Sequence, residues 1–257
     1  MTSPAPDIPP RFRGVLLDWR GTLVVGPSPR SLVVRALHVT GRDASPDAVA
    51  GVLEQLAQAD DTAVASSAID TDAALHRSAY LAWFREAGLD DELAAALYAA
   101  ESDVLDNPFA HDVGPLLEAL ADAGVRVAVV SDIHVDIRPA FAAHARPDGG
   151  TWADLVDCWV LSSELGVAKP DPEIFRAALA GLALAAAEVL MVGDRGAWDG
   201  AAADLGITTL LVPPLRSAED TRLQRVIDLV LPGASLSRSP RGRTTGPIER
   251  TDPSGVR

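Results

Sequence analysis

The chain has 257 residues, of which 48% are hydrophobic, and its formal net charge at pH 7 is −14. This length and apolar content predict a folded chain with a buried core, and the strong negative charge argues against nucleic acid and anionic membranes as partners. No apolar run is long enough to span a membrane and the opening "MTSPAPDIPP" lacks the pattern of a secretory signal, so we expect a cytoplasmic protein.

The first predicted element is a short apolar strand, "GVLLD" at 14–18, which ends on Asp18. The span 28–111 then shows Ala- and Leu-rich helical periodicity, as in "ELAAALYAAESDVL", and no convincing strand. A crossover between parallel strands needs only about a dozen residues. The span therefore predicts a separate helical cap mounted at the carboxyl edge of the sheet.

Beyond the predicted cap, helical and strand-like patterns alternate along the chain. This alternation predicts an α/β fold with a doubly wound, Rossmann-like parallel sheet, built from residues 13–27 and 112–232. The single cysteine, Cys158, cannot form an internal disulfide, and we expect it to be a buried structural thiol. The expected elements are helices at 113–124 and 171–184 and strands at 125–132, 157–163, 189–194 and 207–212.

The two ends of the chain differ in composition from the rest. We expect residues 1–12 to be disordered. Residues 233–257 are rich in Ser, Pro and Gly and carry five arginines against Glu249 and Asp252. This composition cannot bury enough surface to fold alone, which predicts a disordered basic tail, solvated rather than used for docking.

Four short polar motifs follow or end predicted strands, and the carboxyl ends of parallel strands meet at one edge of a sheet. We therefore expect their side chains to form one site. A carboxylate that attacks a phosphoryl group needs a cation to neutralise the anionic oxygens, a hydroxyl and a basic group to hold them, and further carboxylates to hold the cation. The motifs offer a candidate for each: Asp18 with Gly21-Thr22, Ser131-Asp132, Lys169-Pro170-Asp171, and Gly193-Asp194 followed by Asp199.

The segments "DWRGTL", "VVSD", "KPDPEIF" and "VGDRGAWDGAAADLGITTLLV" resemble the four motifs of the haloacid dehalogenase-like (HAD) hydrolase superfamily. The resemblance implies a Rossmann-like core with an inserted helical cap, dependence on Mg²⁺, and a covalent aspartyl-enzyme intermediate. It makes Asp18 the nucleophile, and Ser131 and Lys169 the groups that bind the phosphoryl group of a small substrate. It also makes Asp194 a Mg²⁺ ligand, with Asp199 a supporting ligand or a neighbouring carboxylate.

The composition supports a functional role for Lys169, because the chain contains 21 arginines and Lys169 is its single lysine. A compact ammonium suits a position between a carboxylate and a phosphoryl oxygen better than a planar guanidinium does. Chance placement on a solvated loop is the alternative. The same count argues against the phosphonoacetaldehyde hydrolases, which resemble "DWRGT" in placing Trp after the nucleophile but use a cap lysine. The predicted cap has none.

Arg20 stands where phosphatases of this superfamily usually carry a second Asp that acts as acid and base. A guanidinium cannot exchange protons at relevant pH, and loss of that assistance is worth about 10²–10⁴-fold in rate. By the resemblance, the backbone carbonyl of residue 20 remains a metal ligand whatever the side chain.

Three interpretations of Arg20 stay open. In the favoured one, Arg20 binds the anionic group of a phosphorylated substrate whose leaving group departs unprotonated, as an acyl or aryl phosphate does. In the second, the chain is a 2-haloacid dehalogenase, although family dehalogenases resemble one another in having an aromatic residue here and lacking Gly-Asp. In the third, the chain binds a phosphorylated ligand without turnover, and Arg20 pairs with Asp18.

Several further residues lie near the motifs. Asp132 is a candidate for substrate binding, although its position favours capping of the next helix, and His134 fits a loop or a helix surface better than a ligand site. Trp19 and Trp198 are assigned to packing against the cap or to stacking on substrate. The cap arginines Arg30, Arg35, Arg77 and Arg85 include a possible substrate anchor.

Overall fold

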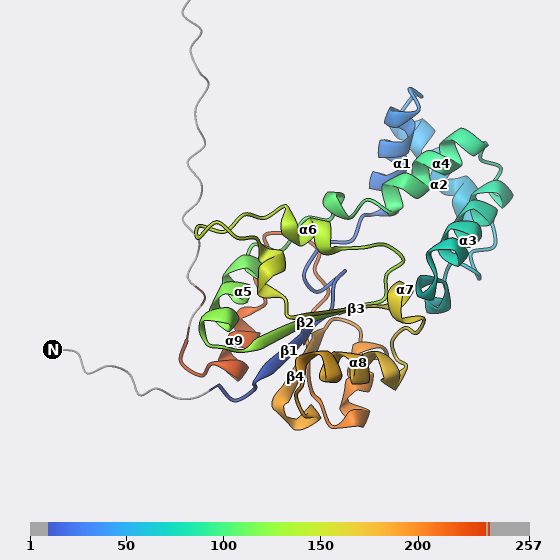
Figure 1. Ribbon diagram of the computed structural model, residues 1–257. Helices are drawn as coiled ribbons and strands as arrows, with labels where there is room; N and C mark the ends of the chain where they lie inside the picture. The colour runs from blue at the N-terminus through green and yellow to red at the C-terminus, as the bar shows by residue number, and fades with distance from the viewer. Residues whose placement is uncertain (1–9, 235, 237–257) are drawn as a thin grey trace, which may run out of the picture.

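The computed structural model describes residues 10–234 and residue 236, and it confirms the predicted α/β fold with a helical cap. Its centre is a five-stranded parallel sheet in the order β3-β2-β1-β4-β5 (Figure 1). The first strand lies in the middle, and all four of its residues are buried, which explains its uninterrupted apolar sequence. The strands are β1 (Gly14–Leu17), β2 (Arg126–Ser131), β3 (Cys158–Leu161), β4 (Val189–Gly193) and β5 (Thr208–Leu211).

Helices cover both faces of the sheet, as a doubly wound fold requires (Figure 1). Alternate side chains of β1 point to opposite faces: Val15 and Leu17 pack in one core cluster, and Leu16 packs in the other. The first cluster includes residues of α5 (Val113–Asp122) and α9 (Gln224–Val230). The second includes residues of α8 (Pro172–Leu182) and the 3₁₀ segment η5 (Asp199–Leu205).

The inserted cap is a group of helices with its own apolar core, set to one side of the sheet (Figure 1). Each of its four α-helices begins at a Ser or Asp whose side chain accepts a hydrogen bond from a backbone N–H of the first turn. The cap elements are α1 (Pro29–Val39), α2 (Pro46–Gln58), η1 (Ser67–Thr71), α3 (Ala73–Glu86), α4 (Asp91–Glu101) and η2 (Val104–Asp106).

The cap meets the core at the carboxyl edge of the sheet. The hydroxyl of Ser162, the residue that follows β3, donates a 2.7 Å hydrogen bond to the backbone carbonyl of Asp70 in η1. The remaining short elements lie in the core: α6 (Arg138–Ala142), η3 (Trp152–Leu155), α7 (Ser162–Leu165) and η4 (Ala186–Glu188).

The expected disordered ends fall mostly outside the described residues. Residues 10–12, however, differ from the expectation: Phe12 is buried in the core, and the N–H of Arg11 donates to the carbonyl of Val230 at 3.0 Å. The apolar ring of Phe12 gives this part of the segment a reason to pack. Within the described part of the chain, no helix has the length and apolarity needed to cross a membrane.

Candidate active site

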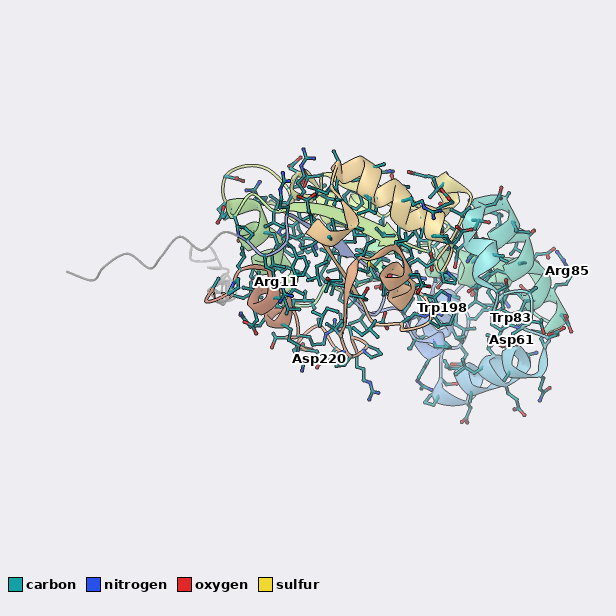
Figure 2. The ribbon with its side chains drawn as sticks, turned by 90° about the horizontal axis from the view of Figure 1, so that it is seen from below. Arg11, Asp61, Trp83, Arg85, Trp198 and Asp220 are labelled. Carbon is teal, nitrogen blue, oxygen red and sulfur yellow. The ribbon has the colours of Figure 1, made fainter. Side chains whose placement is uncertain are left out.

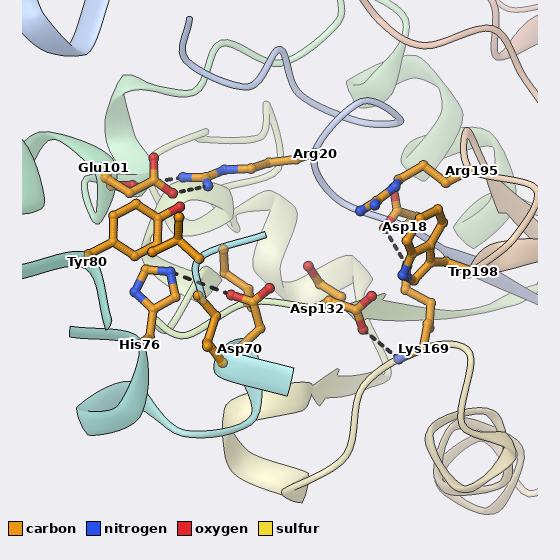
Figure 3. Close-up of a pocket in the computed structure, with 14 residues that line it drawn as sticks. Asp18, Arg20, Asp70, His76, Tyr80, Glu101, Asp132, Lys169, Arg195 and Trp198 are labelled. Carbon is orange, nitrogen blue, oxygen red and sulfur yellow. Dashed lines mark hydrogen bonds and ion pairs between the residues drawn. The ribbon is translucent and has the colours of Figure 1, made fainter. Parts of the chain in front are cut away.

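A cavity of 180 Å³ lies between the carboxyl edge of the sheet and the cap (Figure 3). The core side carries the predicted residues Asp18, Arg20, Ser131, Asp132 and Lys169, whereas Asp194 and Asp199 are outside the described lining. Figure 2 shows Trp198 where the core meets the cap. The opposite side is formed by cap residues of η1, α3 and α4. The polar and aromatic lining residues are Asp18, Arg20, Asp70, His76, Tyr80, Glu101, Ser131, Asp132, Lys169, Arg195 and Trp198.

Asp18 and Lys169 form the centre of the core side. The Lys169 ammonium donates to Asp18 Oδ1 at 2.6 Å and to Asp199 Oδ1 at 2.7 Å, and the Thr22 hydroxyl donates to Asp18 Oδ2 at 2.8 Å. Burial alone would lower the pKa of Lys169, but Asp18, Asp199 and Asp132 raise it above its usual value. Burial raises the pKa of Asp18, and Lys169 opposes that rise. The ammonium therefore stays charged and holds two carboxylates that could not otherwise be buried together.

Three carboxylates converge beside this ammonium. One oxygen each of Asp18, Asp194 and Asp199 lies within 4.8 Å of the others. Burial, followed by the charges of Asp18 and Asp199, raises the pKa of Asp194 to about 6. Together, the three carboxylates and the ammonium have a formal charge of −2. Carboxylate oxygens are ligands that Mg²⁺ prefers. The donor set therefore fits a hard divalent cation.

Asp199 already has partners on both of its carboxylate oxygens. The ammonium of Lys169 donates to Oδ1, and the backbone N–H of Arg195 donates to Oδ2 at 2.8 Å. The carboxylate of Asp194 accepts one 3.4 Å hydrogen bond from the Thr22 hydroxyl and is only half buried. Asp194 is therefore the better placed of the two to contact a cation.

The turn after Asp18 requires glycine at position 21. Gly21 has a φ of +85°, and a Cβ added there would lie 2.5 Å from Asp194 Oδ2. The residue thus combines a backbone conformation that disfavours side chains with close approach to a candidate metal ligand.

We expect Gly21→Ala to reduce stability by about 1–3 kcal/mol through backbone strain and, in addition, to weaken Mg²⁺ binding by displacing Asp194. Urea unfolding and Mg²⁺ titration measure the two effects. The matched control is Gly206→Ala, because Gly206 has a φ of +81° and an added Cβ would meet nothing within 4 Å. Equal Mg²⁺ affinity in both variants would contradict the assigned role of Gly21.

Arg20 is held by the segment that leads from the cap back to the core. Its guanidinium donates to Glu101 Oε1 at 2.6 Å, to the backbone carbonyl of Glu101 at 2.8 Å, and to Asn107 Oδ1 at 3.0 Å (Figure 3). In the described structure its ionic partner is Glu101, whereas Asp18 pairs with Lys169. The pairing of Arg20 with Asp18, which the non-catalytic interpretation included, is therefore not what the structure shows.

Ser131 is the last residue of β2, and Asp132 comes directly after it. Ser131 is buried and lines the cavity, as its assignment to phosphoryl binding requires. The expectation that Asp132 caps the next helix is wrong, because α6 begins only at Arg138. Instead Asp132 Oδ1 accepts a 2.8 Å hydrogen bond from the backbone N–H of Lys169, which fixes the loop that carries the ammonium.

Two further expectations need correction. Trp19 is fully buried in the main core, where it packs on Phe109 and Phe141 with ring centroids 5.2 and 5.3 Å away. It therefore neither packs against the cap nor stacks on substrate. His134 lies in a loop, as one of the two expectations had it, but it is 3% exposed and stacks on His76 of the cap with ring centroids 3.4 Å apart, so it is not at the surface. Both positions depend on tertiary packing that the local pattern does not encode.

The cap side of the cavity contains residues that the motifs did not reveal. The signal available for them was the four-residue spacing of His76 and Tyr80, which places both on one face of a helix. Neither Asp70 nor Arg195 had a comparable signal; the guanidinium of Arg195 lies 3.7 Å from the ring centroid of Trp198. The described cavity lining does not include Arg30, Arg35, Arg77 or Arg85.

The comparisons with known proteins agree with this architecture. A sequence profile of the haloacid dehalogenase-like hydrolases matches residues 12–206, and the chain belongs to that family. A comparison with curated proteins gives no match.

Similar solved structures include both dehalogenases and phosphatases. A 2-haloacid dehalogenase from Pseudomonas syringae pv. Tomato is 21% identical with a TM-score of 0.53, covering 78% of this chain and 86% of that one. The L-2-haloacid dehalogenase of Xanthobacter autotrophicus is 21% identical with a TM-score of 0.56, covering 80% and 79%. A predicted phosphoglycolate phosphatase from Haemophilus somnus is 18% identical with a TM-score of 0.54, covering 83% and 91%. These likenesses establish the shared fold.

Proposed function

We propose that this HAD-like hydrolase is a Mg²⁺-dependent phosphatase that acts on a small phosphorylated molecule through a phosphorylated Asp18. The observation that carries the proposal is the convergence of Asp18, Asp194 and Asp199 around one ammonium. A halide leaving group brings no phosphoryl oxygens to neutralise. A cluster with a residual charge of two minus suits a substrate that is bound together with a divalent cation.

In the proposed reaction, a carboxylate oxygen of Asp18 attacks phosphorus and the bond to the leaving group breaks, with its electron pair passing to that group. Water then attacks the phosphorus, the bond to Asp18 breaks, and the carboxylate is restored, while the protons of the water pass to the released phosphate and to solvent because Arg20 cannot accept one. Lys169 holds the nucleophile and, with Ser131, binds phosphoryl oxygens, while Asp18, Asp194 and the residue 20 carbonyl hold the cation. When bound, Mg²⁺ neutralises charge on the phosphoryl group.

Arg20 determines which leaving groups the site can expel. Its guanidinium cannot donate a proton usefully, and three hydrogen bonds to Glu101 and Asn107 hold it in place. The favoured substrates are therefore those with a leaving group of low pKa, such as acyl and aryl phosphates. We assign Arg20 to fixing the cavity wall, because its ion pair with Glu101 largely offsets the charge that would attract an anionic substrate.

The test compares acetyl phosphate, an aryl phosphate and an alkyl phosphate, with and without Mg²⁺. We expect Mg²⁺-dependent turnover that rises as the leaving-group pKa falls. The double variant Arg20→Asp with Glu101→Gln restores a carboxyl group without placing it against Glu101. We expect it to gain at least about 10²-fold on the alkyl phosphate, the lower range for general acid–base catalysis. Glu101→Gln alone is the control.

Three results would speak against this assignment. Equal rates on alkyl and activated phosphates in the native chain would contradict the role of Arg20. Metal-independent halide release from a 2-haloacid would identify a dehalogenase instead. Stabilisation by phosphorylated ligands without turnover of any of them would indicate a binding protein.

A further inference from the structure

We propose that Asp70, His76 and His134 form a binding site for a divalent transition-metal ion, with Zn²⁺ as the best match, separate from the carboxylate cluster around Asp18. The site would join the cap to the core: Asp70 lies in η1, His76 in α3, and His134 in the loop after β2. Metal binding at this site does not depend on the proposed phosphatase activity, whereas the link between metal occupancy and substrate selection rests on it.

The three side chains converge from different elements. His76 Nε2 lies 3.7 Å from Asp70 Oδ1, and His134 Nδ1 lies 3.9 Å from the same oxygen. One ligand atom from each residue lies within 4.8 Å of the others. Figure 3 shows His76 and Asp70 on the cavity side away from Asp18 and Lys169.

The hydrogen bonds on the outer side of the two rings determine what faces Asp70. His76 Nδ1 lies 3.3 Å from the Tyr98 hydroxyl, and His134 Nε2 lies 3.0 Å from the Ser102 hydroxyl. A metal-ligating histidine characteristically donates its other ring N–H to such a partner. With that tautomer, each ring directs a nitrogen lone pair toward the carboxylate.

The inner nitrogens lack an ordinary partner. His134 Nδ1 is buried in a side chain that is 1% exposed, and it has no hydrogen-bond partner among the described residues. The distances of 3.7 and 3.9 Å to Asp70 exceed a hydrogen bond. Two lone pairs and a carboxylate pointing at one another repel unless a positive species lies between them, and a metal ion supplies that charge.

The protonation preferences of the site agree with this geometry. Burial, followed by the charge of Arg20, lowers the pKa of His76 to about 4. Burial, followed by His76 and Arg20, lowers the pKa of His134 to about 3. Both imidazoles are therefore in the neutral form that binds metal. Burial, followed by the charge of Asp132, raises the pKa of Asp70 to about 6, and the charges of Arg20 and Arg195 only partly oppose this rise.

The ligand set favours a borderline-soft ion over Mg²⁺. Imidazole nitrogen suits Zn²⁺, Fe²⁺, Ni²⁺ and Cu²⁺, and two nitrogens with one carboxylate form a three-ligand set that leaves a further position open. Zinc bonds of about 2.0–2.1 Å in a tetrahedron place ligand atoms about 3.3 Å apart. The separations of 3.7 and 3.9 Å to Asp70 would need to close by a few tenths of an ångström, and the third pair of ligand atoms lies within 4.8 Å. The two rings, now stacked at 7° to each other, would tilt apart on binding.

The open position would face the cavity, because Asp70 and His76 line it. An ion there would add a positive charge on the cap side, opposite the phosphoryl subsite around Asp18. The ligand class that this position would take is an anionic oxygen, such as a carboxylate or second phosphate of the substrate. Metal occupancy and substrate selection would then be linked through the cap.

The experiment uses the full chain after chelation, carrying Asp194→Asn so that the carboxylate cluster no longer competes for the ion. Zn²⁺ is titrated while bound metal and the unfolding temperature are followed, and Co²⁺ is used as a spectroscopic probe of nitrogen ligation. We expect one equivalent of Zn²⁺, a raised unfolding temperature, and visible Co²⁺ bands. The readouts require no turnover, so failure of the phosphatase assignment would leave them unchanged.

Two ligand variants and one control make the result specific. Asp70→Asn keeps the size of a partly exposed side chain, and His76→Ala removes one ring; each should weaken Zn²⁺ binding by about 100-fold or more. His38→Ala, on an exposed position of the same cap, should leave binding unchanged. The proposal is overturned if Zn²⁺ does not bind, or if Asp70→Asn and His76→Ala bind Zn²⁺ as strongly as the parent protein does. Either result would indicate that the three groups share protons and bind no metal ion.

Discussion

Replacement of Asp18 by asparagine is expected to abolish Mg²⁺-dependent phosphate release, with a loss of at least about 10⁴-fold, because the amide cannot act as the nucleophile. The substitution preserves the size of a buried side chain whose two oxygens accept from Lys169 and Thr22. It removes one negative charge, and Lys169 keeps Asp199 as its ionic partner. The fold should therefore survive the change.

The measurement is phosphate release from an aryl phosphate, together with thermal unfolding of the same preparations. Asp122→Asn is the matched control, because Asp122 is exposed on α5 away from the cavity. It should retain full activity. A folded Asp18→Asn protein that keeps more than about a tenth of native turnover would remove Asp18 from the nucleophile's role, since loss of a nucleophile costs far more than tenfold.

Replacement of Lys169 by methionine is expected to cost about 3–5 kcal/mol of stability at pH 7, as well as activity. Methionine matches the length of the lysine stem but leaves Asp18 and Asp199 buried without the ammonium that now bridges them at 2.6 and 2.7 Å. Removing one partner of a buried ion pair has this cost because the remaining charge stays desolvated.

The deficit should shrink as the pH falls. In the variant, burial holds the pKa of Asp18 above that of the unfolded chain, and Lys169 no longer opposes this rise. The folded state therefore gains a proton first as the pH falls and recovers stability as that proton binds. Urea unfolding at pH 7 and pH 5 tests this sign. Arg176→Met is the control: the exposed ion pair of Arg176 with Glu173 should contribute less than about 1 kcal/mol at either pH. A pH-independent deficit would show that lost packing, rather than buried charge, causes the effect.

The core side of the site was predictable because it depends on strand ends. A strand that must be buried on both faces reads as a continuous apolar run, and the first polar residue after it, Asp18 after β1 or Ser131 at the end of β2, marks the sheet edge. The parallel order then brings these ends together. Lys169 stood out because the composition contains no other lysine.

The cap side was not predictable, for a physical reason. Asp70, His76 and His134 meet only once the cap rests on the core, and that contact depends on single interactions such as the hydrogen bond from Ser162 to Asp70. Helical periodicity identifies which cap residues are apolar and hence buried, but it does not reveal which polar residues face another domain. The buried position of Trp19 escaped prediction in the same way.

The hydrogen bonds from Arg20 to Glu101 and Asn107 also limit how the cap can move relative to the core. Any motion that swings the end of α4 away from the turn after β1 must break three hydrogen bonds together, one of which is also an ion pair. In this chain, the side chain at position 20 therefore links the cap to the core. We expect this link to hold the cap and the core in one relative orientation. A cavity of fixed shape favours ligands of one shape over a range of shapes.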